Sequence, residues 1–74
     1  MTSVYSNDYQ MVISALREAR IASHITQEAL ASAFGRPQSF IAKVESGERR
    51  LDVVEFVRFC RLVGFDPASI LDKL

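Results

Sequence analysis

The 74-residue sequence predicts an all-α fold, a compact single domain of five helices. Apolar residues recur at the three- and four-residue spacing of amphipathic helices, and no segment alternates with the period of two that a half-buried strand requires. Capping residues, glycines and prolines divide the chain between these segments. A chain of this length is near the lower limit for an independent core, so we expect one domain over residues 1–74, with residues 1–5 as a frayed arm.

The first helix is expected to begin among the capping residues Ser6, Asn7 and Asp8 and to end near Ala22, with Asn7 and Gln10 at capping-box spacing. At about 100° per residue, its apolar side chains gather on one face. That face comprises Tyr9, Val12, Ile13, Leu16 and Ala19.

Arg20 falls inside this apolar face. A buried guanidinium is costly unless it is paired with an acid, and Glu45 lies beside the apolar seam formed by Ile41 and Val44. We therefore predict an Arg20–Glu45 ion pair that locks the first helix to the end of the third. The alternative is that Arg20 lays its stem along the apolar surface and reaches water.

Residues 25–47, ITQEALASAFGRPQSFIAKVESG, predict two short helices joined by a tight turn. Thr26 is a good cap for the first helix, and Gly35 takes a left-handed turn conformation without a Cβ penalty. Pro37 suits the first position of the next helix, which covers about residues 37–45. These are the requirements of a helix-turn-helix, whose second helix reads the major groove of DNA.

The reading helix is expected to turn Ile41 and Val44 inward, which leaves a polar face for the groove. On that face, Gln38 can pair with adenine N6 and N7, Ser39 can donate or accept, and Lys43 can reach a guanine edge or a phosphate. Simple solvation is the alternative for a polar helix face.

Phe40 lies between the core face and the groove face of the same helix. It is a base-reading candidate, since its ring could touch a thymine methyl group. Packing against Phe34 or another apolar neighbour is the alternative, and we favour it slightly.

Phosphate contacts are expected on either side of the reading helix. Gln27 lies in the first turn of the preceding helix, where an amide donor and the helix dipole both favour a phosphate. The other phosphate candidates are Arg36, Ser46, Arg49 and Arg50. The net charge of the chain is zero, but residues 36–50 hold four basic and two acidic residues, so positive charge is concentrated at the proposed DNA side.

Asp52 and Glu55 form a capping-box start for a fourth helix, which is expected to run to about Val63. A final short helix is expected from Pro67 to about Lys73. The inward face of the fourth helix would comprise Val53, Phe56, Val57, Cys60 and Val63, with Phe59 at its margin. Its water-facing residues would be Glu55, Arg58 and Arg61.

The motifs TQEALA at residues 26–31 and IAKVESG at residues 41–47, joined through a turn glycine, resemble those of the phage-repressor-like (Cro/CI-type, XRE) helix-turn-helix regulators. The resemblance runs from about Arg17 to Asp66, roughly two-thirds of the chain. It implies a lambda-repressor-like DNA-binding domain, and it points to the same arginine–glutamate pair.

Two positions depart from the pattern of that family. The family usually has a glycine near His24, so slight backbone strain is expected there. The position of Arg36 is commonly apolar in the family, so its guanidinium is expected to exchange turn packing for a phosphate contact.

No enzyme, metal or cofactor site is expected. Cys60 is the only cysteine, so it cannot form an internal disulfide and is interpreted as a small core residue. His24 has no partner at catalytic or ligand spacing and is interpreted as a turn residue. Paired carboxylates and a phosphate-cradling loop are also absent from the sequence. The N-terminus lacks signal-peptide features and the apolar runs are interrupted, so we expect a cytoplasmic protein.

The sequence therefore predicts a sequence-specific regulator of transcription, a repressor that binds double-stranded operator DNA as a homodimer. Candidate dimer residues are Val54, Leu62, Ile70, Leu71 and Leu74, with Met11 or Ile21. Two alternatives stay open: an antitoxin that binds DNA through the same fold, and a protein-binding helical module, which the zero net charge favours. Binding that survives high salt and ignores DNA would select the module.

Overall fold

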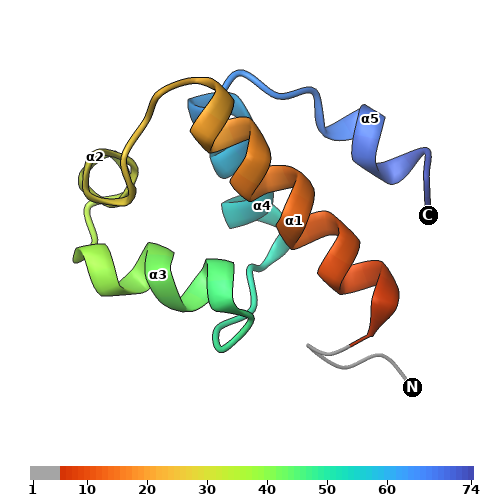
Figure 1. Cartoon of the computed structure of the whole chain (residues 1–74), viewed down its shortest axis with the longest axis horizontal. Helices are drawn as coiled ribbons and strands as arrows, with labels where there is room; N and C mark the ends of the chain where they lie inside the picture. The colour runs from red at the N-terminus through yellow and green to blue at the C-terminus, as the bar shows by residue number, and fades with distance from the viewer. Residues whose placement is uncertain (1–5) are drawn as a thin grey trace.

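The computed structural model describes residues 6–74, which form five α-helices and no strand (Figure 1). The helices are α1 (Asn7–Ala22), α2 (Gln27–Phe34), α3 (Gln38–Ser46), α4 (Val53–Leu62) and α5 (Pro67–Leu71). The arm expected over residues 1–5 lies outside the described residues. None of the helices within residues 6–74 has the length and apolar character needed to cross a bilayer.

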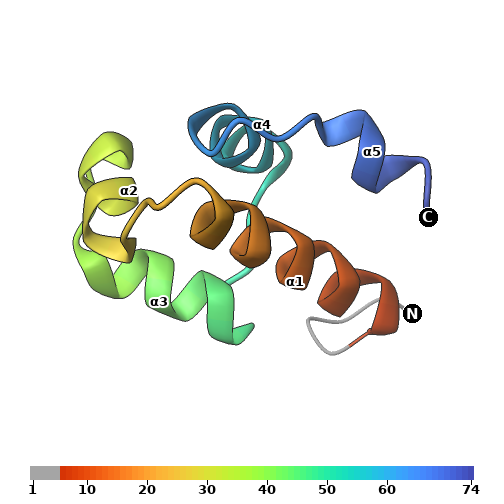
Figure 2. The ribbon, with the colours of Figure 1, turned by 45° about the horizontal axis from the view of Figure 1, so that its top comes forward.

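The longest helix, α1, organises the arrangement of the others. Figures 1 and 2 show α2 and α3 together at one end of the molecule, α5 at the opposite end, and α1 running between them. In Figure 2, α4 lies on the other side of α1 from α3. The helix-turn-helix and the C-terminal helix are therefore on opposite ends of a body measuring 32 × 23 × 19 Å.

The core draws side chains from all five helices. Leu16 of α1, Leu30 of α2, Ile41 of α3 and Phe59 of α4 are each almost completely buried, and Ile70 brings α5 onto the same cluster. Tight packing of this kind makes core positions sensitive to the loss of a single methylene. The core therefore fixes the faces that each helix presents to solvent.

Most of the expected caps are present. The Thr26 hydroxyl accepts from Ala29 N at 3.0 Å, and Asp52 and Glu55 form a reciprocal capping box. Of the three cap candidates at the start of α1, Ser6 is the N-cap, and its hydroxyl accepts from Tyr9 N at 3.2 Å. Since the Asn7 backbone is already helical, its side chain cannot serve as the cap.

Pro37 also occupies a different position from the one expected. It is the N-cap of α3, with an extended ψ of 157°, and not the first helical residue. Its ring still presets φ at −66°, and the helix begins at the following residue, Gln38. The shift moves the start of α3 by one residue.

The rotation of α4 about its axis differs from the sequence prediction. Val53, expected on the inner face, is 76% exposed, whereas Phe59, expected at the margin, is completely buried. The ring of Phe59 lies edge-on to Phe34, with ring centroids 6.3 Å apart. The large aromatic side chain buries more apolar area than a valine, so it sets the face that α4 turns inward.

His24, in the connection between α1 and α2, has a backbone φ of 59° and is the non-glycine residue of the described chain with a positive φ. A side chain in this region is sterically disfavoured, as expected from the glycine that the family carries near this position. The neighbouring Ser23 hydroxyl donates to Val63 O at 2.7 Å and ties this connection to the end of α4. This hydrogen bond to the end of α4 therefore stabilises the strained turn.

Candidate nucleic-acid interface

The turn between α2 and α3 is built around Gly35. Its φ of 70° is left-handed, and its N–H donates to Ser32 O at 2.9 Å while Arg36 N donates to Ala31 O at 3.0 Å. These bonds satisfy the last carbonyls of α2 and reverse the chain within three residues. The extended Pro37 then starts α3 in its new direction.

The inner and outer faces of α3 are clearly separated. Ile41 and Val44 are completely buried. Gln38, Ser39 and Lys43 are exposed on the opposite side, as the spacing predicts. The helix thus projects a polar face from a packed body, which is the geometry a groove-reading helix needs.

One flank of that face is held by a buried ion pair between α1 and α3. Arg20 Nε lies 2.6 Å from Glu45 Oε2, and Nη2 donates to Oε1 at 2.9 Å. Arg20 Nη1 also donates to Ile25 O at 2.8 Å, while Arg17 Nε approaches Glu45 Oε1 at 3.9 Å. The two paired side chains are only 10% and 4% exposed, so Arg20 does not reach out to water.

The Glu45 carboxylate is also the first member of a hydrogen-bond chain that includes two glutamine amides. Gln27 Nε2 donates to Glu45 Oε1 at 2.9 Å, and Gln27 Oε1 accepts from Gln38 Nε2 at 2.7 Å. This bond between the two glutamines could not be predicted from the sequence, because it depends on how closely α2 and α3 cross. It connects the buried charge to Gln38, the first residue of α3.

These hydrogen bonds change the phosphate-binding role that was predicted for Gln27. Expected as an open phosphate donor, Gln27 instead uses its carbonyl and one N–H inside the protein. One amide N–H of Gln27 is left for an outside acceptor. Gln38 keeps its carbonyl oxygen and one N–H, which is the pair of groups that an adenine edge requires.

The other flank of α3 carries Phe40, which is only 6% exposed. Its ring packs against Phe34, with centroids 5.4 Å apart, and the guanidinium groups of Arg36 and Arg49 lie over it at 4.9 and 4.8 Å. The expectation that Phe40 reads a base is therefore wrong, because the ring is covered by its own chain. Packing, the alternative stated for this residue, is what the structure shows.

Glu55 joins the two arginines on this flank. Arg49 Nη1 and Nη2 donate to the two carboxylate oxygens of Glu55 at 3.0 and 3.1 Å, and Arg36 Nη2 lies 4.0 Å away. One of the same oxygens accepts from Asp52 N at 3.0 Å in the capping box. Glu55 was expected to face water, but its side chain is only 14% exposed, because it serves a helix cap and an ion pair together.

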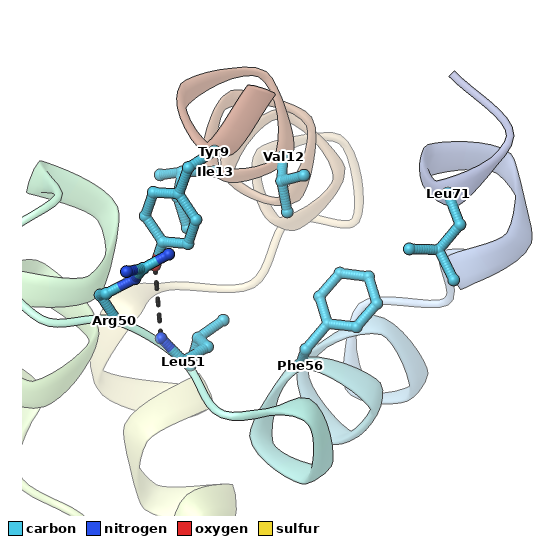
Figure 3. Close-up of a pocket in the computed structure, with 7 residues that line it drawn as sticks. All are labelled: Tyr9, Val12, Ile13, Arg50, Leu51, Phe56 and Leu71. Carbon is cyan, nitrogen blue, oxygen red and sulfur yellow. Dashed lines mark hydrogen bonds between the residues drawn. The ribbon is translucent and has the colours of Figure 1, made fainter. Parts of the chain in front are cut away.

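The remaining phosphate candidates lie at the end of α3 and in the following loop. Ser46 is exposed and its hydroxyl donates to Lys43 O at 3.1 Å. Arg50 is exposed, with its guanidinium 5.0 Å from the centre of the Tyr9 ring, as Figure 3 shows. The Tyr9 hydroxyl accepts from Leu51 N at 3.3 Å, so this part of the loop is anchored on α1.

A small apolar cleft lies beside this loop (Figure 3). It has a volume of about 220 Å³ and lies between α1, α4 and α5, with Val12, Phe56 and Leu71 among its lining residues. Ligand sites usually begin at about 300 Å³ and contain several converging polar groups. The cleft is smaller and mostly apolar.

Few side chains among residues 6–74 could serve as a nucleophile or a metal ligand. Cys60 is buried in the core, and burial raises the pKa of its thiol, which keeps it in the unreactive protonated form. His, Cys, Asp and Glu side chains do not gather in any group of three that could hold a metal ion in this part of the chain.

Comparison with known proteins agrees with this geometry. The sequence profile of a helix-turn-helix domain family matches residues 14–71. An XRE-family like protein from Pseudomonas syringae pv. tomato str. DC3000 has a similar structure, with a TM-score of 0.82 and 55% sequence identity over 89% of this chain and 80% of that one. No curated protein matches the chain. The chain therefore belongs to the XRE-type helix-turn-helix family of DNA-binding regulators.

Proposed function

We propose that the protein is a sequence-specific repressor of transcription that places α3 in the major groove of a double-stranded operator. The exposed polar face of α3, backed by the buried Ile41 and Val44, is the observation that carries this proposal. We further propose that residues 1–74 act as one domain, in the cytoplasm, without a cofactor and without enzymatic activity.

Gln38 is the principal base-reading residue in this proposal. It is the first residue of α3, and its amide is turned by Gln27, which accepts one of its N–H groups. A glutamine that presents its other N–H and its carbonyl side by side matches adenine N7 and N6. Because its orientation is set before DNA arrives, less rotamer entropy is lost on binding.

Ser39 and Lys43 extend the reading face along α3. Both are exposed, on the half of α3 that faces away from the buried Ile41 and Val44. A serine hydroxyl pairs with several bases, whereas a lysine ammonium reaches a guanine edge or a phosphate. We propose that Ser39 and Lys43 contribute less to the sequence preference than Gln38 does.

Phosphate contacts position the reading face. Arg50 and Ser46 follow α3 on the exposed surface, and Arg36 precedes it. Gln27 offers its remaining amide N–H at the start of α2, where the helix dipole favours an anion. Arg49 can join this set only when a phosphate replaces its carboxylate partner, Glu55.

We propose a homodimer as the DNA-binding form, since one reading helix covers only a few base pairs. Val54, Leu62, Leu71 and Leu74 remain large exposed apolar residues of the C-terminal half. Ile70, a candidate from the sequence, is 2% exposed and belongs to the core, so it cannot serve as a dimer contact. Sedimentation velocity at micromolar concentration tests this proposal.

A protein partner is the second candidate function. Val53 and Val54 are exposed side by side at the start of α4, a feature that DNA binding does not require. An antitoxin that captures a toxin, or a protein-binding helical module, would use such a surface. Association with a protein through it would survive high salt, whereas binding to DNA must weaken.

Selection of bound sequences from a random duplex pool tests the proposed function. The proposal expects an enriched motif with adenine at a fixed position. A dimer adds a second, inverted copy of the motif with centres about 34 Å apart or a multiple of that distance. A pool that shows no enrichment, with binding independent of salt, would refute it.

A further inference from the structure

We infer that Glu55 is an internal counter-ion that competes with DNA phosphates for Arg49, and to a lesser degree for Arg36, and so limits the affinity of the protein for any duplex. The inference rests on the proposed function and assigns a regulating residue to the same surface. The groups concerned lie on the flank of α3 on which Phe40 is buried.

The two arginines and the acid form one compact cluster. Both guanidinium groups lie within 5 Å of the centre of the same ring, that of Phe40, so they follow one flank of α3. Arg36 comes from the turn before α3 and Arg49 from the loop after it. Glu55, in the first turn of α4, lies 3.0 Å from Arg49 and 4.0 Å from Arg36.

The cluster occupies the place where a DNA backbone would pass. A helix lying in the major groove has a phosphate backbone on each side of it. On the flank opposite the buried Arg20–Glu45 pair, the side chains of Arg36 and Arg49 are 50% and 38% exposed, so they are near enough to the surface to meet phosphates. Both of these arginines share Glu55.

Arg49 binds Glu55 through the bidentate geometry that it would use for a phosphate. Both of its Nη atoms are engaged by the two carboxylate oxygens. Paired bonds between an arginine and an oxyanion are among the strongest in proteins, and phosphate and carboxylate make equivalent use of them. A phosphate can therefore bind the Arg49 guanidinium fully only after displacing Glu55.

Glu55 cannot move away easily to make room. Its side chain is 14% exposed, and it accepts from Asp52 N as the reciprocal member of the capping box. The carboxylate is therefore fixed beside Arg49 whether or not DNA is present. In the DNA complex its negative charge stays near the phosphates, where it opposes binding to every sequence alike.

The variant Glu55→Gln separates this role from the structural one. Glutamine serves at the third position of a capping box as well as glutamate, so the start of α4 is retained while the charge is removed. Arg49 and Arg36 then become available to phosphates. We expect E55Q to bind both operator and random duplex about fivefold to tenfold more tightly at 0.1 M salt, with the salt slope steeper by about 0.9.

Two controls test the counter-ion role, one for a general change in net charge and one for dependence on Arg49. Asp72→Asn removes an acid after α5, at the end of the molecule opposite α3, and is expected to leave affinity within about twofold of wild type. The double variant R49Q/E55Q removes both partners and is expected to return affinity and salt slope to wild-type values. Thermal melting of each variant checks that it is folded.

The outcomes separate this inference from the function on which it rests. A wild-type chain that binds no duplex at low salt would refute both. If wild type binds and folded E55Q binds equally or more weakly, only the counter-ion role is refuted. An equal gain in D72N refutes it as well, because net charge would then explain the effect. A gain in E55Q that persists in R49Q/E55Q also refutes it, because the gain would then not depend on Arg49.

Discussion

Gln38 Nε2 donates a 2.7 Å hydrogen bond to Gln27 Oε1, and Gln27 in turn donates to the buried carboxylate of Glu45 at 2.9 Å. The side chain at the start of α3 is thus connected to the ion pair that joins α1 and α3. A network whose members are all satisfied fixes side-chain orientation better than a single contact. The buried ion pair and the exposed side chain of Gln38 are therefore connected by one set of hydrogen bonds.

Replacing Gln27 by Ala is expected to weaken operator binding by about 1–2 kcal/mol, because Gln38 loses the acceptor that orients it. If Gln27 acts through Gln38, the double variant Q27A/Q38A should bind little worse than Q38A alone. A double-mutant cycle by fluorescence anisotropy measures this coupling. Fully additive losses would show that Gln27 acts independently, for example through a phosphate.

Replacing Glu45 by Ala is expected to destabilise the protein by about 3–5 kcal/mol, since it leaves the Arg20 guanidinium buried without its acid partner. For a domain of this size, the melting temperature should fall by about 12 °C or more. Calorimetry measures the change, and Glu18→Ala, at an exposed position of α1, is the control. An unchanged melting temperature would contradict the structural importance of the pair.

Replacing His24 by Gly is expected to raise the free energy of unfolding by about 1 kcal/mol, because the backbone at φ 59° is strained for a residue with a Cβ atom. The greater entropy of glycine in the unfolded chain offsets part of that gain. Urea denaturation measures the difference. Ala22→Gly, at the helical end of α1, should have the opposite sign, and equal destabilisation by both changes would argue against strain at His24.

Replacing Arg50 by Gln is expected to weaken binding to all duplexes alike and to reduce the salt slope by about 0.9, as loss of one phosphate contact requires. Lys73→Gln, which follows α5 at the end of the molecule opposite α3, is the charge-matched control and should change neither quantity. Titrations at several salt concentrations give both values. A change confined to one operator sequence would instead assign Arg50 to base reading.

The helix-turn-helix itself could be predicted because its signals are local. Thr26 and Gly35 set the ends of α2 through their own backbone requirements, and the spacing of Ile41 and Val44 decides which side of α3 is buried. The Arg20–Glu45 pair was predictable for a different reason. A charge on an apolar face requires a partner, and few acids were suitably placed.

The rotation of α4 could not be deduced from the pattern of its residues. Its sequence VVEFVRFC places apolar side chains around more than half of the helix, so several rotations satisfy the same periodicity. Packing with the rest of the core selected the one that buries Phe59 and exposes Val53. Only the tertiary fit contains that information.

The contacts that flank α3 also depend on tertiary positions. The capping box already explained Glu55, so its second role toward Arg49 gave no separate signal in the sequence. Phe40 was ambiguous because it lies at the boundary between two helix faces, and the side chains of Arg36 and Arg49 decide that it is covered. Long side chains from loops cannot be placed by helical spacing.

The most direct measurement compares base preferences of wild type and Gln38→Ala in parallel selections from one random duplex pool. The wild-type chain is expected to enrich an adenine at one position of each half-site. The variant should lose preference at that position alone, with the preferred site weakened by about 1–3 kcal/mol. An identical motif and affinity for the two proteins would contradict the assignment of α3 as a reading helix led by Gln38.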